Sequence, residues 1–149
     1  MPTHYTRLLQ FSQQFGKFYV REFTPLLKET GFSMREVHVL LFLANNPSYD
    51  TARDITEFRG LSKSQVSQAV DFLAAEGLLN RTPDPFDRRV IHLSITKYGL
   101  PFAKRCQEIQ EACGNRLLSV LSAQENAQLR QLLDKVLINS EHIFEELDR

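Results

Sequence analysis

Residues 61–96, LSKSQVSQAVDFLAAEGLLNRTPDPFDRRVIHLSIT, decide the fold that we predict for this chain. In the first part of this stretch, apolar residues recur at i, i+3, i+4 and i+7, and a polar set repeats with the same spacing. Such spacing predicts a helix with one packing face and one exposed polar face. The packing face holds Val66, Ala69, Val70 and Leu73, and the polar face holds Ser64, Ser67, Gln68 and Asp71.

A β-hairpin is predicted directly after this helix. Gly77 can end the helix, and residues 78–81 resume as a strand. Residues 83–85, Pro-Asp-Pro, favour a turn, and side chains in residues 89–96 alternate between two faces as in a second strand. A hairpin attached to a helix in this way is typical of a wing.

A short helix is predicted just before residue 61. Asp50 or Thr51 can cap it, its inward residues would be Ala52, Ile55 and Phe58, and Gly60 supplies a left-handed exit. Since only a Gly-containing turn separates it from the next helix, the pair predicts a helix-turn-helix, in which the second helix enters a DNA major groove.

Further helices are predicted on both sides of this unit. Residues 6–30 form the first and Gly31 ends it, while Ser33 and Glu36 stand at capping-box spacing ahead of residues 34–45. Thr96 can cap a helix over residues 97–121, and Ser122 begins the last helix. An apolar stripe on the last helix requires a partner; it comprises Leu129, Leu132, Leu133, Val136, Leu137, Ile143, Phe144 and Leu147.

The first helix carries an aromatic stripe that has two interpretations. Phe11, Phe15 and Phe18 lie at i, i+4 and i+7, which favours a buried helix or a subunit interface over a crevice for a small aromatic effector. His38 stands among apolar neighbours, where a satisfied, half-buried histidine is a better interpretation than a ligand or a base. Phe11, Phe15 and His38 are the candidates for an effector crevice.

Composition indicates one ordinary globular domain. The 149 residues are 42% hydrophobic and 24% charged, with a formal net charge of zero. Between residues 50 and 92, six Lys or Arg stand against seven Asp or Glu. Because phosphate binding needs local positive potential, any contact with nucleic acid must depend on where a few cations point.

Cysteine usage and the N-terminus predict a reduced, cytoplasmic protein. Cys106 and Cys113 lie about 10.5 Å apart along one predicted helix, too far to form a disulfide. Residues 1–5 lack a signal-peptide pattern, and the longest apolar run, residues 39–44, is too short to span a bilayer. We expect no membrane association, metal or cofactor.

The polar face of the helix suits base edges and phosphates. Gln68 could pair with adenine, the serines could bind bases or phosphates, and Lys63 is placed for phosphate. The alternative, that this face is only solvated, is equally good from the helix alone. The hairpin arginines favour DNA, because a minor groove focuses negative potential, and Asp87 would fix the turn or orient an arginine. The expected DNA contacts are Lys63, Ser64, Gln65, Ser67, Gln68, Arg88 and Arg89.

These residues resemble a known family. Residues 87–99, DRRVIHLSITKYG, are similar to the DxRxxxLxLTxxG wing signature of MarR-type winged-helix regulators, with Ile95 in place of the second Leu. Residues 60–67, 71–73 and 76–79 resemble that family's recognition helix and its exit. The resemblance implies a homodimer that represses or activates transcription, joined through its terminal helices and often released by a small ligand. Gln68 and Phe72 depart from the usual arginine and polar residue, so base preference does not carry over.

The predicted fold class is mainly α with a small β-hairpin wing, a winged helix-turn-helix with N- and C-terminal dimerisation helices. We expect one domain over residues 1–149, with residues 33–96 as the DNA-binding lobe and residues 1–30 and 97–149 as the dimerisation part. The expected function is a homodimeric repressor on a pseudo-palindromic duplex, with release by an effector as an extension. The alternative is a winged-helix protein-interaction module; no local zinc, phosphate-loop or nucleophile motif favours an enzyme.

Overall fold

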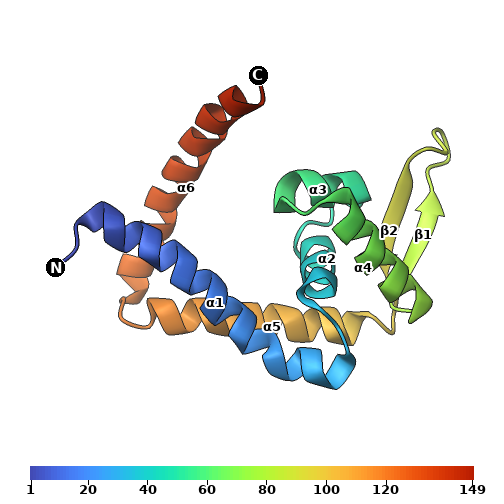
Figure 1. Cartoon of the computed structure of the whole chain (residues 1–149), viewed down its shortest axis with the longest axis horizontal. Helices are drawn as coiled ribbons and strands as arrows, with labels where there is room; N and C mark the ends of the chain where they lie inside the picture. Colours follow the sequence, from blue (N-terminus) through green and yellow to red (C-terminus); the bar gives the residue numbers. More distant parts are fainter. The chain divides into compact units, whose positions relative to one another are not determined.

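The computed structural model describes residues 1–149, apart from the side chain of Asp148. It contains helices and one two-stranded antiparallel sheet (Figure 1). The elements are α1 (His4–Thr30), α2 (Met34–Asn45), α3 (Ala52–Arg59), α4 (Lys63–Ala75), β1 (Leu79–Pro83), β2 (Ile91–Ile95), α5 (Leu100–Leu118), α6 (Ala123–Glu145) and the 3-10 turn η1 (Glu146–Asp148). The predicted fold class, mainly α with a β-hairpin wing, is confirmed.

The chain forms two compact units, Met1–Glu111 and Ala112–Arg149. The first holds α1 to α4, the hairpin and most of α5. The second holds the end of α5, α6 and η1. None of the residues of α6, whose side chains are all described, is buried.

Capping residues in the sequence set the helix boundaries in the first unit. Capping boxes begin α2, α3 and α4; the pairs are Ser33 with Glu36, Thr51 with Asp54, and Ser62 with Gln65. Gly60 and Gly77 have positive φ angles of 67° and 74°, a conformation that L side chains adopt only with strain. The chain can therefore turn sharply from α3 into α4 and from α4 into β1.

The core of the first unit is built around α2 and α4. Leu40 of α2 is fully buried, as are Ile55 of α3 and Val66 and Leu73 of α4. Leu93 of β2 closes the same cluster. The packing face predicted for α4 is therefore confirmed, and burial of these side chains holds α3, α4 and the hairpin as one body.

The residues of α3 that face the core differ from the sequence prediction. On α3 only Ile55 points inward; Ala52 is exposed, and Phe58 lies on the surface against the rings of Phe42 and Tyr49, at centroid distances of 6.2 and 4.8 Å. The reason is that a helix of eight residues presents only about two turns to the core.

The helix after the hairpin also begins later than predicted, at Leu100. Thr96 is occupied with the hairpin: its N–H donates to the carbonyl of Leu78 (3.0 Å), and its hydroxyl donates to the carbonyl of Gly77 (2.7 Å). The hydroxyl also accepts from the N–H of Gly99 (3.1 Å). Residues 97–99 therefore form a turn that joins the end of α4 to the start of α5.

Candidate nucleic-acid interface

The predicted contact residues of α4 lie together on its exposed face. Lys63, Ser64, Gln65, Ser67 and Gln68 are all exposed, whereas the intervening Val66 is fully buried. The helix therefore presents short polar groups and one ammonium group to the outside. Such groups match base edges and phosphate oxygens.

Gln65 also has a structural task at the start of α4. Its side-chain oxygen accepts from the N–H of Ser62 (3.0 Å), and the Ser62 hydroxyl accepts from the N–H of Gln65 (3.1 Å). The amide oxygen of Gln65 is therefore occupied by the capping box, which fixes the beginning of the helix.

Gln68 is held by an arginine from another helix. The guanidinium of Arg35, in the first turn of α2, donates to the side-chain oxygen of Gln68 and also to the hydroxyl of Ser33 (3.2 Å). The amide nitrogen of Gln68 points to the hydroxyl of Ser64 at 3.4 Å. Arg35 thus adds a positive charge to the polar face of α4. Sequence reasoning missed it, because this contact joins residues 33 positions apart.

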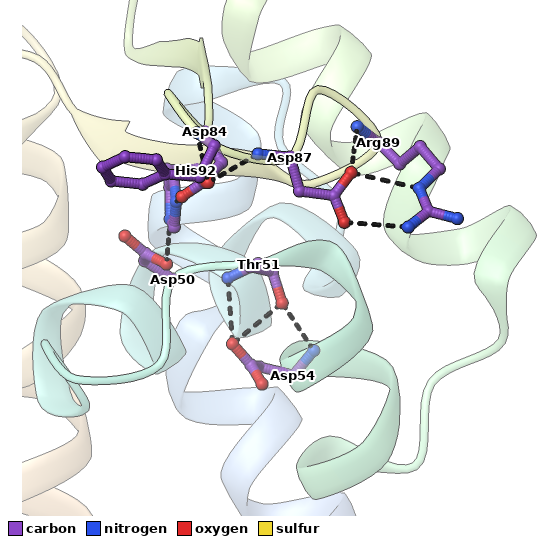
Figure 2. A network of polar contacts seen from close by, with 8 residues as sticks. Asp50, Thr51, Asp54, Asp84, Asp87, Arg89 and His92 are labelled. Carbon is purple, nitrogen blue, oxygen red and sulfur yellow. Dashed lines mark hydrogen bonds and ion pairs between the residues drawn. The ribbon is translucent and has the colours of Figure 1, made fainter.

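The turn between β1 and β2 carries both predicted arginines. Figure 2 shows Arg89 with the carboxylates of the turn. One carboxylate oxygen of Asp84 accepts from the N–H groups of Phe86 and Asp87, both at 3.0 Å. Asp87 in turn accepts from the Arg89 backbone N–H (3.1 Å) and from its Nε (3.0 Å) and Nη2 (3.1 Å). The side chain of Arg89 remains 90% exposed, so its guanidinium is oriented and still accessible.

The hydrogen bonds of the turn also stabilise the ionised forms of its two carboxyl groups, Asp84 and Asp87. Hydrogen bonds from Arg89 to its side chain hold the pKa of Asp87 below its ordinary value. The hydrogen bond from His92, with those from the Phe86 and Asp87 backbone, lowers the pKa of Asp84. Both carboxyl groups are therefore ionised near neutral pH and accept hydrogen bonds only. Arg88, beside them, is exposed at the tip.

His92 of β2 links this turn to the start of α3. Its Nδ1 lies 2.8 Å from a carboxylate oxygen of Asp50, and its Nε2 lies 2.9 Å from the second oxygen of Asp84 (Figure 2). The backbone adds a second link, since the N–H of Leu93 donates to the carbonyl of Asp50 at 2.7 Å. No local sequence signal predicts a contact between residues 50 and 92.

A cavity of about 640 Å³ lies between α3, α4 and the hairpin. Its apolar floor includes Val66 and Val70, and its rim carries Arg53, Lys63 and Arg81. Arg81 pairs with Asp71 on α4, which ties the base of the wing to the recognition helix. Arg53 and Lys63 therefore place positive charge beside this cavity, although residues 50–92 carry no net positive charge.

The described contacts place the three effector candidates in two groups. Phe11 and Phe15 stack on α1 with centroids 5.9 Å apart, and Phe11 is 53% exposed. His38 instead accepts from Nη2 of Arg59 at 2.9 Å. Burial, with the nearby Arg59 charge, lowers the pKa of His38 to about 4, so the ring is neutral at pH 7.

Both cysteines of the chain lie in α5. Cys106 and Cys113 form no disulfide, as predicted, and both are buried. Burial raises the pKa of Cys106 to about 11, which keeps this thiol protonated. Among the residues that the structure describes, no group of three or more His, Cys, Asp or Glu is arranged to hold a metal ion. Within the same described part, no helix combines the length and hydropathy needed to cross a membrane.

A helix-turn-helix that leads into a two-stranded hairpin defines the class of winged helix-turn-helix proteins. The model of the MarR family matches residues 30–90. The chain is 32% identical over 118 residues to the uncharacterised HTH-type transcriptional regulator YkoM of Bacillus subtilis, an alignment that covers 78% of this chain and 75% of YkoM. The chain belongs to the MarR family.

Two further proteins show how far the similarity extends. The transcriptional repressor MprA of Escherichia coli K12 is 33% identical over 78 residues, which cover 52% of this chain and 44% of MprA, less than half of that relative's length. The crystal structure of the S. aureus MepR–DNA complex superposes with a TM-score of 0.68 at 21% identity, covering 93% of this chain and 99% of MepR. The latter similarity shows the shared fold.

Proposed function

We propose that this protein is a sequence-specific DNA-binding transcriptional regulator that acts in the cytoplasm as a homodimeric repressor on a pseudo-palindromic duplex. The observation that carries the proposal is the exposed polar face of α4 beside a wing whose Arg89 is oriented by Asp87. Membership of the MarR family, the DNA in the MepR complex and the repressor name of MprA support it.

In this proposal the side chains have separate tasks on DNA. Ser64, Ser67 and Gln68 contact base edges in the major groove, with Gln65 beside them at the start of the helix. Lys63 contacts a phosphate. Arg88 and Arg89 enter the adjacent minor groove, where the negative potential is concentrated, and Asp87 sets the direction of Arg89.

In this proposal residues 33–96 bind DNA, and residues 1–30 and 97–149 form the dimer interface. Large apolar side chains on α1 and α6 are exposed in the single chain, among them Leu9 (74%), Leu132 (61%) and Val136 (62%). Exposed apolar surface of this extent is typical of an interaction site. Two copies would place two recognition helices about one helical turn of DNA apart.

A small aromatic effector at Phe11, Phe15 and His38 is the remaining part of the proposal. Two stacked phenyl rings provide an aromatic surface, and the neutral imidazole of His38 provides a polar group for orientation. Calorimetric titration with small aromatic acids, using the Phe15→Ala variant as control, tests this part independently of DNA.

The central experiment is selection of bound duplexes from a random DNA pool, followed by affinity measurements at fixed salt. We expect an enriched site with two-fold symmetry. Arg89→Ala and Ser67→Ala should each weaken binding about tenfold, whereas Lys28→Ala on α1 should have no effect. Unchanged binding by both variants would show that the assigned groove contacts are wrong.

Failure to enrich any duplex would favour a different function. The nearly neutral segment of residues 50–92, with six Lys or Arg against seven Asp or Glu, is the observation that suggests a winged-helix protein-interaction module. Such a module would show no salt-dependent affinity for DNA and would co-purify with a protein partner.

A further inference from the structure

His92 has carboxylate oxygens at both ring nitrogens. Nδ1 faces Asp50 at 2.8 Å and Nε2 faces Asp84 at 2.9 Å. A neutral imidazole has one donor and one acceptor nitrogen, and an ionised carboxylate can only accept. Both contacts are therefore satisfied only when the ring carries two protons, that is, as an imidazolium.

The two carboxylates belong to different parts of the interface. Asp50 precedes Thr51, the N-cap of α3, and Asp84 lies in the turn between β1 and β2. The Asp84 oxygen that does not face His92, Oδ2, accepts from the backbone N–H of Asp87, whose own carboxylate holds Arg89. A continuous series of contacts thus runs from the start of α3 through the imidazole to the wing guanidinium (Figure 2).

Among the described residues, two carboxylates are the charged groups that contact the ring. From the loop before α3 it meets Asp50, and from the turn it meets Asp84. Its cross-strand partner on β1 is Thr82, and the bridge to the α3 loop is made with Thr51, both of which are uncharged.

We propose that His92 is a positioning residue for DNA binding, which in its imidazolium form ties the wing turn to the start of α3 and on deprotonation releases the turn and weakens the complex. This inference depends on the proposed function, because it concerns how the wing arginine is presented to DNA. All of the residues that form this series of contacts belong to one chain.

The sign of the pH effect follows from the two carboxylates. Hydrogen bonds to Asp84 and Asp50 raise the pKa of His92 above the ordinary 6.5. The contribution of the imidazolium is fully present below about pH 6.5 and is lost as the pH rises through the raised pKa. DNA affinity should therefore fall as the pH is increased from mildly acidic to alkaline.

The test is a titration of affinity against pH, from 6 to 9 at constant ionic strength, with the duplex enriched by the selection. We expect the wild type to lose about three- to tenfold in affinity across this range. His92→Gln, which is uncharged and keeps one amide donor, should bind weakly at pH 6 and show a flat profile. His4→Gln, which replaces an exposed histidine at the start of α1, should keep the wild-type profile.

A second measurement does not require DNA. Ring-nitrogen NMR of the free protein should show His92 doubly protonated at pH 6, and its deprotonation should shift the backbone amides of Asp87 and Arg89. Absence of DNA binding at every pH would contradict the proposed function, while the NMR titration would still test the contact series. A neutral His92 ring at pH 6, or a His92→Gln profile as steep as that of the wild type, would overturn the inference.

Discussion

Arg35 shows how a single side chain changes the chemistry of the recognition face. It donates to the side-chain oxygen of Gln68, so this glutamine presents its remaining amide group beside a guanidinium. A glutamine alone suits adenine, but a guanidinium in the same place suits guanine or a phosphate. If Gln68 contacts a base as proposed, we expect the pair of residues to set the base preference at this position.

We predict that Arg35→Ala weakens binding to the selected duplex about tenfold and relaxes discrimination at one base pair. The reason is that Gln68 loses its fixed orientation together with the neighbouring positive charge. Affinities for duplexes with single base-pair changes provide the measurement, and Lys28→Ala is the control for loss of a cation. Discrimination equal to that of the wild type would show that Arg35 serves only to pack α2 against α4.

We predict that His38 makes the folded protein less stable in acid. Its folded-state pKa of about 4 lies below the ordinary 6.5, because the ring is partly buried and faces Arg59. The unfolded chain therefore binds the proton first as pH falls, and stability decreases from about pH 6.5 towards pH 4.

The His38→Gln variant should lose part of this dependence, since its amide oxygen can accept from Arg59 without titrating. Urea midpoints of both proteins at pH 7 and 4.5 provide the measurement. An equal loss of stability in the two proteins would mean that other groups account for acid unfolding.

At the scale of elements, the junction between the hairpin and α5 depends on a close backbone approach. A Cβ built on Gly99 would lie 2.2 Å from the carbonyl oxygen of Leu78. Thr96 binds both sides of this junction through its backbone and its hydroxyl. The Thr and Gly of the wing signature therefore join α4, the hairpin and α5, and their contacts are structural.

We predict that Gly99→Ala destabilises the protein by about 1–3 kcal/mol, because either the Leu78 backbone or the start of α5 must move. Gly114→Ala, within α5, is the control, since a Cβ at Gly114 would meet nothing within 4 Å. That change should stabilise the protein by roughly 0.5–1 kcal/mol through helix propensity. Chemical denaturation measures both; equal effects would contradict the assigned role of Gly99.

At the scale of the molecule, the single chain leaves much apolar surface uncovered. The exposed residues of α6 include Leu133 (47%) and Leu137 (56%), and those of α1 include Leu8 (55%) and Tyr5 (77%). A folded chain gains free energy by removing such surface from water. Dimerisation through the terminal helices, as proposed above, would achieve this.

We predict that Leu137→Asp gives a monomer at micromolar concentration, because a charge would be buried at the proposed interface. Binding to a duplex with two half-sites should weaken by more than about tenfold, since one half-site contact would remain. Sedimentation velocity and fluorescence anisotropy test the two effects. Gln131→Asp is the control, as helical periodicity places residue 131 opposite the apolar stripe; a dimeric Leu137→Asp protein would show that this face is not the interface.

Local features of the chain were determined by the sequence alone. The capping boxes at Ser33 and Ser122, the buried stripe of α4 and the hairpin after Gly77 all follow from side chains within a few positions of one another. Helix geometry and backbone hydrogen bonding act over that range, so spacing predicts them. The family and the polar face of α4 could be recognised for the same reason.

Contacts between elements were decided only by the tertiary structure. Arg35 meets Gln68 across 33 positions and His92 meets Asp50 across 42, while Phe58 stays on the surface although its spacing suggests burial. No periodicity relates such residues, because their distances depend on how α2, α3, α4 and the hairpin pack around a common core. Sequence therefore predicted which elements form the candidate interface, and packing determined which charges orient it.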